Sequence, residues 1–118
     1  MEMISMKQAD IWEIDLSPTI GAEIQKVRPA VIINDDAIGV LPLRVIVPIT
    51  GWKDQFQDAL WMVKLEPESN NNLKKISVAD CFQIRSVSTR RFVRRVGTVS
   101  IEKLKQIKEA VKTVIDAD

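Results

Sequence analysis

Only one stretch of this chain, residues 101–115, carries apolar side chains at helical spacing. Its apolar residues recur every three or four positions, lysines occupy the other faces, and the apolar set is Ile101, Leu104, Ile107, Val111, Val114 and Ile115. Ser100 is suited to the N-cap, and Glu102 lies in the first turn, where the helix dipole favours a negative charge. We therefore predict one helix, at the C-terminal end of a chain whose other segments follow a different period.

The remaining apolar segments alternate or are short, as expected of strands. In residues 11–16 three apolar side chains, Trp12, Ile14 and Leu16, alternate with acidic ones. Pro48 is expected to end a third strand, so that Thr50 lies just beyond it. We predict further strands at 29–34, 43–48, 60–65 and 92–99, with one or two more inside 76–87. Several short strands closed by one helix indicate an antiparallel α+β fold, for example a small barrel, in one domain over residues 1–118.

Composition narrows the chemistry open to the chain. The hydrophobic content of 46% is that of a globular protein, and no apolar run is long enough to span a bilayer. The first residues lack the features of a signal peptide, and the single cysteine suits a reducing compartment, so we expect a cytoplasmic protein. Histidine is absent, which removes the commonest acid–base group and argues against a zinc site. Catalysis would fall to arginine, lysine, carboxylates, hydroxyls or backbone groups.

Charge is unevenly distributed along the chain. Residues 1–60 contain 5 Lys/Arg and 9 Asp/Glu, whereas residues 61–118 contain 12 and 7. The basic excess is greatest between residues 85 and 95, where five arginines meet no acidic residue in the sequence: Arg85, Arg90, Arg91, Arg94 and Arg95. Such a cluster can hold phosphates, or it can be a solvated strand edge that deters aggregation. Charge alone slightly favours the second interpretation.

Two side chains stand where strand ends could bring chemistry together. Arg28 precedes Pro29, which biases its backbone to an extended conformation, and Thr50 precedes a glycine at the end of another predicted strand. A guanidinium can clamp a phosphate through two donors while it stabilises charge during attack by an RNA 2′-hydroxyl, and a threonine hydroxyl can orient either group. On spacing alone, a surface arginine, a turn-satisfying threonine and a surface Glu23–Lys26 ion pair are the commoner outcome.

The sequence around these positions resembles the MazF/PemK-type toxins. Residues 10–23, continuing through 26–32, look like the N-terminal signature of that family. Residues 47–50 are similar to its second motif, and 77–80 together with 83–87 resemble the third. The first motif is long and specific, and the match runs from about residue 7 to the C-terminus.

The resemblance implies a fold and an activity that spacing does not show. The fold would be an SH3-like antiparallel β-barrel with a C-terminal helix, shared with gyrase-poisoning toxins. The protein would be the homodimeric toxin of a type II toxin–antitoxin system, an mRNA interferase that cleaves single-stranded RNA at short sequence motifs. Cleavage would use no metal or other cofactor and leave a 2′,3′-cyclic phosphate and a 5′-hydroxyl. The partners implied are RNA and a cognate antitoxin, with DNA reached only through the antitoxin and no membrane.

The resemblance also assigns roles to individual residues. The essential arginine and threonine of the family fall on Arg28 and Thr50, and the loop glutamate falls on Glu23, as a base or in a positioning role. Trp52 either stacks on a base or packs internally. The RNA-binding residues we predict are Thr19, Gly21, Lys26, Pro29, Trp52, Gln83 and Arg85.

Two departures and two alternatives accompany this assignment. The family usually has glycine where this chain has Ala9, and often serine where it has Ala22, which removes a hydroxyl from the RNA-covering loop and affects the target sequence. The chain could instead be a gyrase inhibitor on the same fold, or a degenerate homologue that only binds antitoxin. The Arg28/Thr50 pair argues against the first alternative, since a gyrase poison has no chemical need for it.

Other side chains are assigned by pattern. We expect Cys81 and Phe82 in the core, and Trp12 and Trp61 in the core or at an interface. We expect Asp80 to pair with Arg85 or another arginine.

Overall fold

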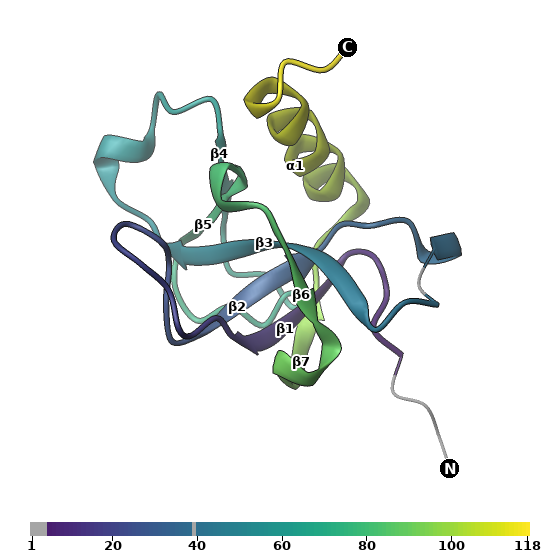
Figure 1. Ribbon diagram of the computed structural model, residues 1–118. Helices are drawn as coiled ribbons and strands as arrows, with labels where there is room; N and C mark the ends of the chain where they lie inside the picture. The colour runs from purple at the N-terminus through teal and green to yellow at the C-terminus, as the bar shows by residue number, and fades with distance from the viewer. Residues whose placement is uncertain (1–4, 39) are drawn as a thin grey trace.

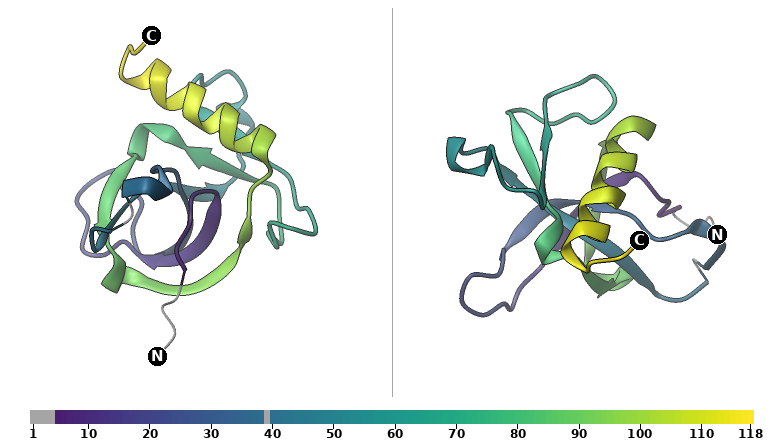
Figure 2. Two further views of the ribbon diagram at one scale, coloured as in Figure 1. Left: turned by 90° about the vertical axis from the view of Figure 1, so that its right-hand side faces the viewer. Right: turned by 90° about the horizontal axis from the view of Figure 1, so that it is seen from above.

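The computed structural model describes residues 5–38 and 40–118, which form a strongly bent antiparallel sheet with one helix packed on it (Figure 1). The sheet order is β4-β5-β3-β2-β1-β7, and β6 pairs with the first half of β3. The elements are β1 (Asp10–Asp15), β2 (Val27–Ile32), β3 (Leu43–Gly51), β4 (Met62–Leu65), β5 (Ser77–Asp80), β6 (Arg85–Ser88), β7 (Phe92–Thr98) and α1 (Ile101–Val114). The sheet curls round on itself but does not close (Figure 2). Its curvature, antiparallel strands and single C-terminal helix confirm the predicted barrel-like α+β fold.

Alternation along the strands divides the core into two clusters on opposite faces of the sheet. One face packs against α1 and contains Ile11, Val31, Val47, Ile49, Val63, Leu65, Ala79, Cys81, Ile107 and Ala110. The other face lies inside the bend and contains Trp12, Ile14, Leu16, Ala30, Ile32, Ile46 and Val87. Trp12 and Cys81 are therefore core residues, as predicted.

Phe82 is not a core residue, and this prediction was wrong. The 3-10 turn Cys81–Gln83 directs Cys81 inward and leaves Phe82 65% exposed. Phe82 packs edge-to-face on the exposed Trp61, with 6.0 Å between ring centroids. The two rings therefore form an aromatic patch on the surface.

The helix begins where its cap predicts. The Ser100 hydroxyl accepts a hydrogen bond from the Lys103 N–H at 3.1 Å, and α1 runs from Ile101 to Val114. Its inner face buries Ile107 and Ala110 against the sheet. Within the described residues, no helix is both long and apolar enough to cross a membrane.

Strand β3 does not end at Pro48, contrary to the prediction. Pro48 pairs with Ala30 of β2 on one side, and on the other side it falls between the end of the β6 pairing at Ile46 and the start of the β5 pairing at Ile49. A proline at this position breaks no pair on that side, because no strand is opposite it there. Thr50 is consequently a strand residue rather than a loop residue.

Candidate functional site

Arg28 and Thr50 lie in one row of residues that crosses the sheet. The pairs Ile14↔Arg28, Thr50↔Val78 and Val78↔Lys64 are all in register. Strands β2 and β3 pair through Ala30↔Pro48, and continuing that register by two residues brings Arg28 level with Thr50. By this extension both side chains project from the same face of the sheet, the face that contains Ala30, Ile32 and Ile46.

The polar groups of this pair are largely unused by the protein. Arg28 is half-buried, and its Nε donates to the Gln25 carbonyl oxygen at 3.4 Å, which steadies the side chain at its inner end. Over residues 5–38 and 40–118, neither the terminal nitrogens of Arg28 nor the Thr50 hydroxyl has a hydrogen-bond partner. Two guanidinium nitrogens and a hydroxyl on the same face of the sheet are therefore available to bind a phosphate.

The β1–β2 loop, residues 16–26, lies beside this pair. Gly21 and Lys26 have positive φ values of 60° and 72°, and the loop is pinned at its base by a backbone hydrogen bond from Leu16 N–H to Lys26 oxygen. Glu23 is exposed and turned back on its own loop, where its Oε1 accepts from the Ile20 N–H at 2.9 Å. The Glu23 carboxylate thus helps to shape the loop.

Gln83 tethers the tip of this loop to the body of the protein. Its Oε1 accepts from the Ile24 N–H at 2.6 Å, and its Nε2 donates to the Ala22 oxygen at 3.4 Å and to Asp80 Oδ2 at 3.1 Å. Burial raises the pKa of Asp80, opposed by hydrogen bonds from Phe82 and Gln83. Asp80 therefore pairs with Gln83, and the predicted pairing with an arginine was wrong.

Arginines from the basic segment hold the beginning of the same loop. Arg85 Nη1 donates to the Leu16 oxygen at 3.4 Å, and Arg91 Nη1 donates to the Asp15 oxygen at 3.1 Å and to the Ser17 oxygen. Further along β7, Arg94 and Arg95 form ion pairs with two acidic residues of β1, Glu13 at 2.6 Å and Asp10 at 3.3 Å. The acids absent from the basic segment in the sequence are supplied by the neighbouring strand.

Trp52 follows directly after β3 and lines a cavity of about 350 Å³. Its Nε1 donates to Asp54 Oδ1 at 3.3 Å, and the Lys64 ammonium lies 4.7 Å from the centre of its ring. Phe56 packs edge-to-face on the indole at 6.3 Å. The remaining lining residues are Gln57 and Met62.

The predicted site residues are only partly brought together. Thr19, Gly21, Glu23 and Lys26 share the β1–β2 loop, and Gln83 and Arg85 contact that loop directly. Pro29 pairs with Glu13 and lies on the face opposite to that of Arg28. The sequence-based prediction missed three contributors: Asp80 as support of Gln83, Arg91 as a loop anchor and Lys64 in the row of Thr50. The roles of Arg91 and Lys64 depend on strand pairing, which no local pattern in the sequence shows, whereas Asp80 contacts Gln83 across a single 3-10 turn.

Cys81 lies close to the site in sequence but cannot serve it as a nucleophile. Burial, with a smaller effect from the charge of Asp80, raises the pKa of the Cys81 thiol to about 12. Its Sγ points inward towards α1, 3.7 Å from the Ile107 oxygen. The thiol therefore stays protonated and belongs to the core.

Comparisons with known proteins give a consistent result. The sequence model of the family described as PemK-like, MazF-like toxin of type II toxin–antitoxin system matches residues 7–115. Endoribonuclease MazF9 of Mycobacterium tuberculosis is 31% identical over 117 residues, covering 94% of this chain and 97% of its own length.

Among solved structures, MazF from Deinococcus radiodurans superposes with a TM-score of 0.81 at 19% identity, over 97% of this chain and 99% of that one. A mycobacterial endoribonuclease in complex with its cognate antitoxin superposes with a TM-score of 0.76 at 16% identity, over 97% and 98% of the two chains. These two likenesses establish the fold.

Proposed function

The chain belongs to the PemK-like, MazF-like toxins of type II toxin–antitoxin systems, and from this premise we propose that it cleaves single-stranded mRNA at short motifs, with Arg28 and Thr50 as its catalytic residues. It is an endoribonuclease, the activity for which its 31% identical mycobacterial relative is named. The observation that carries the residue assignment is the row in which Arg28 stands level with Thr50, with donors left free.

The chemistry this pair supports is an internal transesterification. The 2′-oxygen loses its proton and bonds to the adjacent phosphorus, the bond from phosphorus to the 5′-oxygen breaks, and the leaving oxygen takes up a proton. The products are a 2′,3′-cyclic phosphate and a 5′-hydroxyl. Arg28 stabilises the negative charge that develops on the phosphoryl oxygens, and the Thr50 hydroxyl orients the phosphate or the 2′-hydroxyl.

Glu23 acts mainly through the loop in this proposal. Its carboxylate accepts the Ile20 N–H, so it shapes the segment that would cover the RNA. For Glu23 to remove the 2′-proton itself, that hydrogen bond would have to be exchanged for one to the substrate. No step requires a metal ion, since the charge stabilisation comes from the guanidinium.

Cleavage of a long single-stranded RNA in EDTA tests this proposal. Arg28→Ala and Thr50→Ala should each reduce the cleavage rate by about 10²–10³-fold, the usual cost of losing one group that stabilises a transition state. Arg90→Ala is the matched control, because Arg90 is exposed and, within the described part of the chain, it forms a hydrogen bond only through its backbone N–H, to the Ser88 hydroxyl. Wild-type rates in both site variants would refute the assignment, and gyrase inhibition without RNA cleavage would favour the alternative activity.

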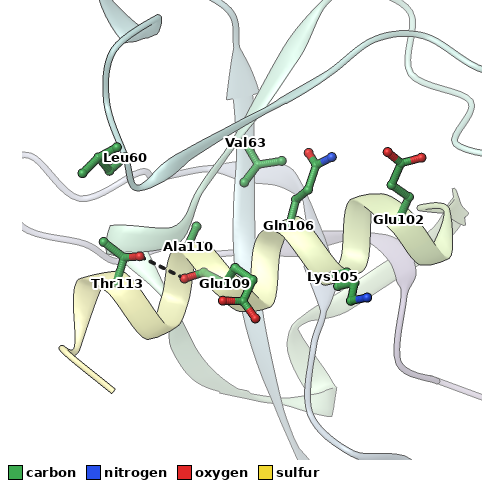
Figure 3. A pocket seen from close by; sticks show the side chains of 8 residues that line it. All are labelled: Leu60, Val63, Glu102, Lys105, Gln106, Glu109, Ala110 and Thr113. Carbon is green, nitrogen blue, oxygen red and sulfur yellow. Dashed lines mark hydrogen bonds between the residues drawn. The ribbon is translucent and has the colours of Figure 1, made fainter. Parts of the chain in front are cut away.

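We also propose that the protein acts in the cytoplasm as a homodimer that is held inactive by an antitoxin. Support comes from an apolar surface around α1, where Leu60 is 74% exposed and a cavity of about 520 Å³ separates it from the helix (Figure 3). In that view Thr113 and Ala110 of α1 border the cavity on the helix side. Exposed apolar surface of this kind is typical of an interface between subunits. Light scattering after gel filtration should give twice the monomer mass, and Leu60→Glu should lower it.

A further inference from the structure

The cavity beside Trp52 combines an aromatic face with charged groups of both signs. Trp52, Phe56 and Met62 supply its apolar wall, while Asp54, Gln57 and Lys64 supply its polar one. Resting on the RNA-cleaving function proposed above, we infer that this cavity is a base-binding subsite selective for guanine. In single-stranded RNA, unstacked bases are bound in this way, stacked on an aromatic side chain and hydrogen-bonded along an edge.

The position of the cavity ties it to the reacting phosphate. Trp52 is separated from Thr50 only by Gly51, and its backbone N–H donates a hydrogen bond to the Ile76 carbonyl oxygen at 3.1 Å. Lys64 stands in the same row as Thr50, two strands away, which corresponds to about 10 Å between the backbones. A base held in this cavity would therefore belong to a nucleotide close to the phosphate that is cut.

The polar groups fit guanine better than the other bases. Guanine presents adjacent N–H donors on its Watson–Crick edge and two acceptors, O6 and N7, on its other edge. The Asp54 carboxylate accepts one hydrogen bond, from Trp52, and keeps acceptor capacity for the guanine donors. The Lys64 ammonium, now over the indole, offers the donor that O6 and N7 require. Uracil would place a carbonyl oxygen against the carboxylate, and adenine would offer it only one amino group.

Cytosine is the closest competitor, because its amino group can also donate to Asp54. Guanine has the advantage of two donors for the two oxygens of a carboxylate and a larger ring system to stack on the indole. Its selection by Asp54 and Lys64 would be worth about tenfold or more at that position, as is usual for paired contacts to one base edge.

Sequencing the ends of a cleaved complex RNA pool tests the inference in the intact protein. We expect guanine to be enriched at one fixed position near the cut by wild type, and this enrichment to fall about tenfold in Asp54→Asn and in Lys64→Gln. Asp58→Asn is the matched control, since Asp58 is an exposed acid of the same loop that does not line the cavity. Equal enrichment in wild type and Asp54→Asn, or enrichment of cytosine in place of guanine, would overturn the inference.

A binding measurement separates this inference from the proposed activity. Guanosine 5′-monophosphate, added in EDTA, should shift the indole N–H signal of Trp52 in NMR spectra, assigned by its loss in Trp52→Phe. Cytidine, adenosine and uridine monophosphates should shift it less at the same concentration. A pool left uncut by wild type would refute the nuclease proposal, whereas no preference of the Trp52 signal for the guanine nucleotide would overturn the subsite.

Discussion

Replacing Gln83 by glutamate changes only the amide nitrogen of the side chain that holds the β1–β2 loop, and it turns an attractive contact with Asp80 into a repulsive one. In the wild type the Gln83 Nε2 donates to Asp80 Oδ2 at 3.1 Å while Oε1 accepts from the Ile24 N–H. A glutamate keeps the acceptor for Ile24 but places a second carboxylate oxygen against the one on Asp80. The substitution therefore tests whether Asp80 fixes the orientation of residue 83, and through it the β1–β2 loop.

The expected cost follows from that contact. A hydrogen bond to a charged group contributes about 1.5–3 kcal/mol, which the variant loses. Two like charges about 3 Å apart repel by roughly 5 kcal/mol at an effective dielectric constant of about 20. Because residue 83 is half-buried, its side chain can turn towards solvent and relieve part of this repulsion. We expect the free energy of unfolding to fall by about 2–3 kcal/mol at pH 8.

The loss should shrink as the pH falls. Two carboxylates at this distance retain one proton between them, so the pKa of the pair is raised in the folded state above its value in the unfolded chain. The stabilisation from the shared proton is complete below the unfolded pKa and is lost as the pH rises through the folded pKa. At pH 5 the variant should therefore lie closer to wild type than at pH 8.

Urea unfolding at the two pH values measures both effects. Gln83→Ala is the control, because it removes the hydrogen bond to Asp80, together with those to Ile24 and Ala22, without adding a charge. It should cost about 1–2 kcal/mol with a smaller dependence on pH. A glutamate variant that is no less stable than the alanine variant at pH 8, and equally affected at both pH values, would refute the role given to the Asp80 contact.

Two further predictions concern backbone positions and are checked by the same unfolding experiments. Gly97→Ala should destabilise the fold by about 3 kcal/mol, because its Cβ would lie 2.4 Å from the Asn70 carbonyl oxygen. Gly51→Ala should leave the stability nearly unchanged, because its Cβ would meet only the flexible end of a lysine side chain, and equal effects of the two substitutions would contradict this. Ala9→Gly should stabilise the fold by about 0.5–1 kcal/mol. Ala9 has a φ of 77°, where a Cβ costs about 1–2 kcal/mol, and only part of this gain is lost to the greater backbone entropy of glycine in the unfolded chain. A destabilised variant would show that the lost methyl contacts dominate.

Local signals predicted the elements whose determinants are local. The helix was placed correctly because its period and its Ser100 cap lie within a few consecutive residues. Pro48 misled the prediction because its effect depends on which strand is opposite it, and β3 changes partner at that point. Phe82 was misassigned for a different reason, since a short 3-10 turn reverses the side expected from its apolar neighbours.

The residues of the candidate site could be proposed from the sequence, but the contacts that support them could not. Arg28 and Thr50 follow from motif resemblance, and their common row follows from strand register, which the sequence does not display. The loop beside them is held by Gln83, Arg85 and Arg91, all of which contact it across more than fifty positions of sequence. Such contacts are set by topology, so a sequence pattern shows that these residues are polar or basic but does not show that they hold the β1–β2 loop.

Ala22 stands where the resemblance to the MazF/PemK-type toxins leads us to expect serine, and it lies on the exposed side of the β1–β2 loop. At this position Gln83 contacts the backbone oxygen, at 3.4 Å, and the side chain is exposed. Losing a hydroxyl here therefore leaves the tether through Gln83 and Asp80 intact. Serine would add one polar group to the exposed surface of the loop, the surface that covers the RNA under the proposed function. Differences from relatives at this position should consequently alter which RNA sequences are cut, and leave the rate at the best sequence and the stability of the fold largely unchanged.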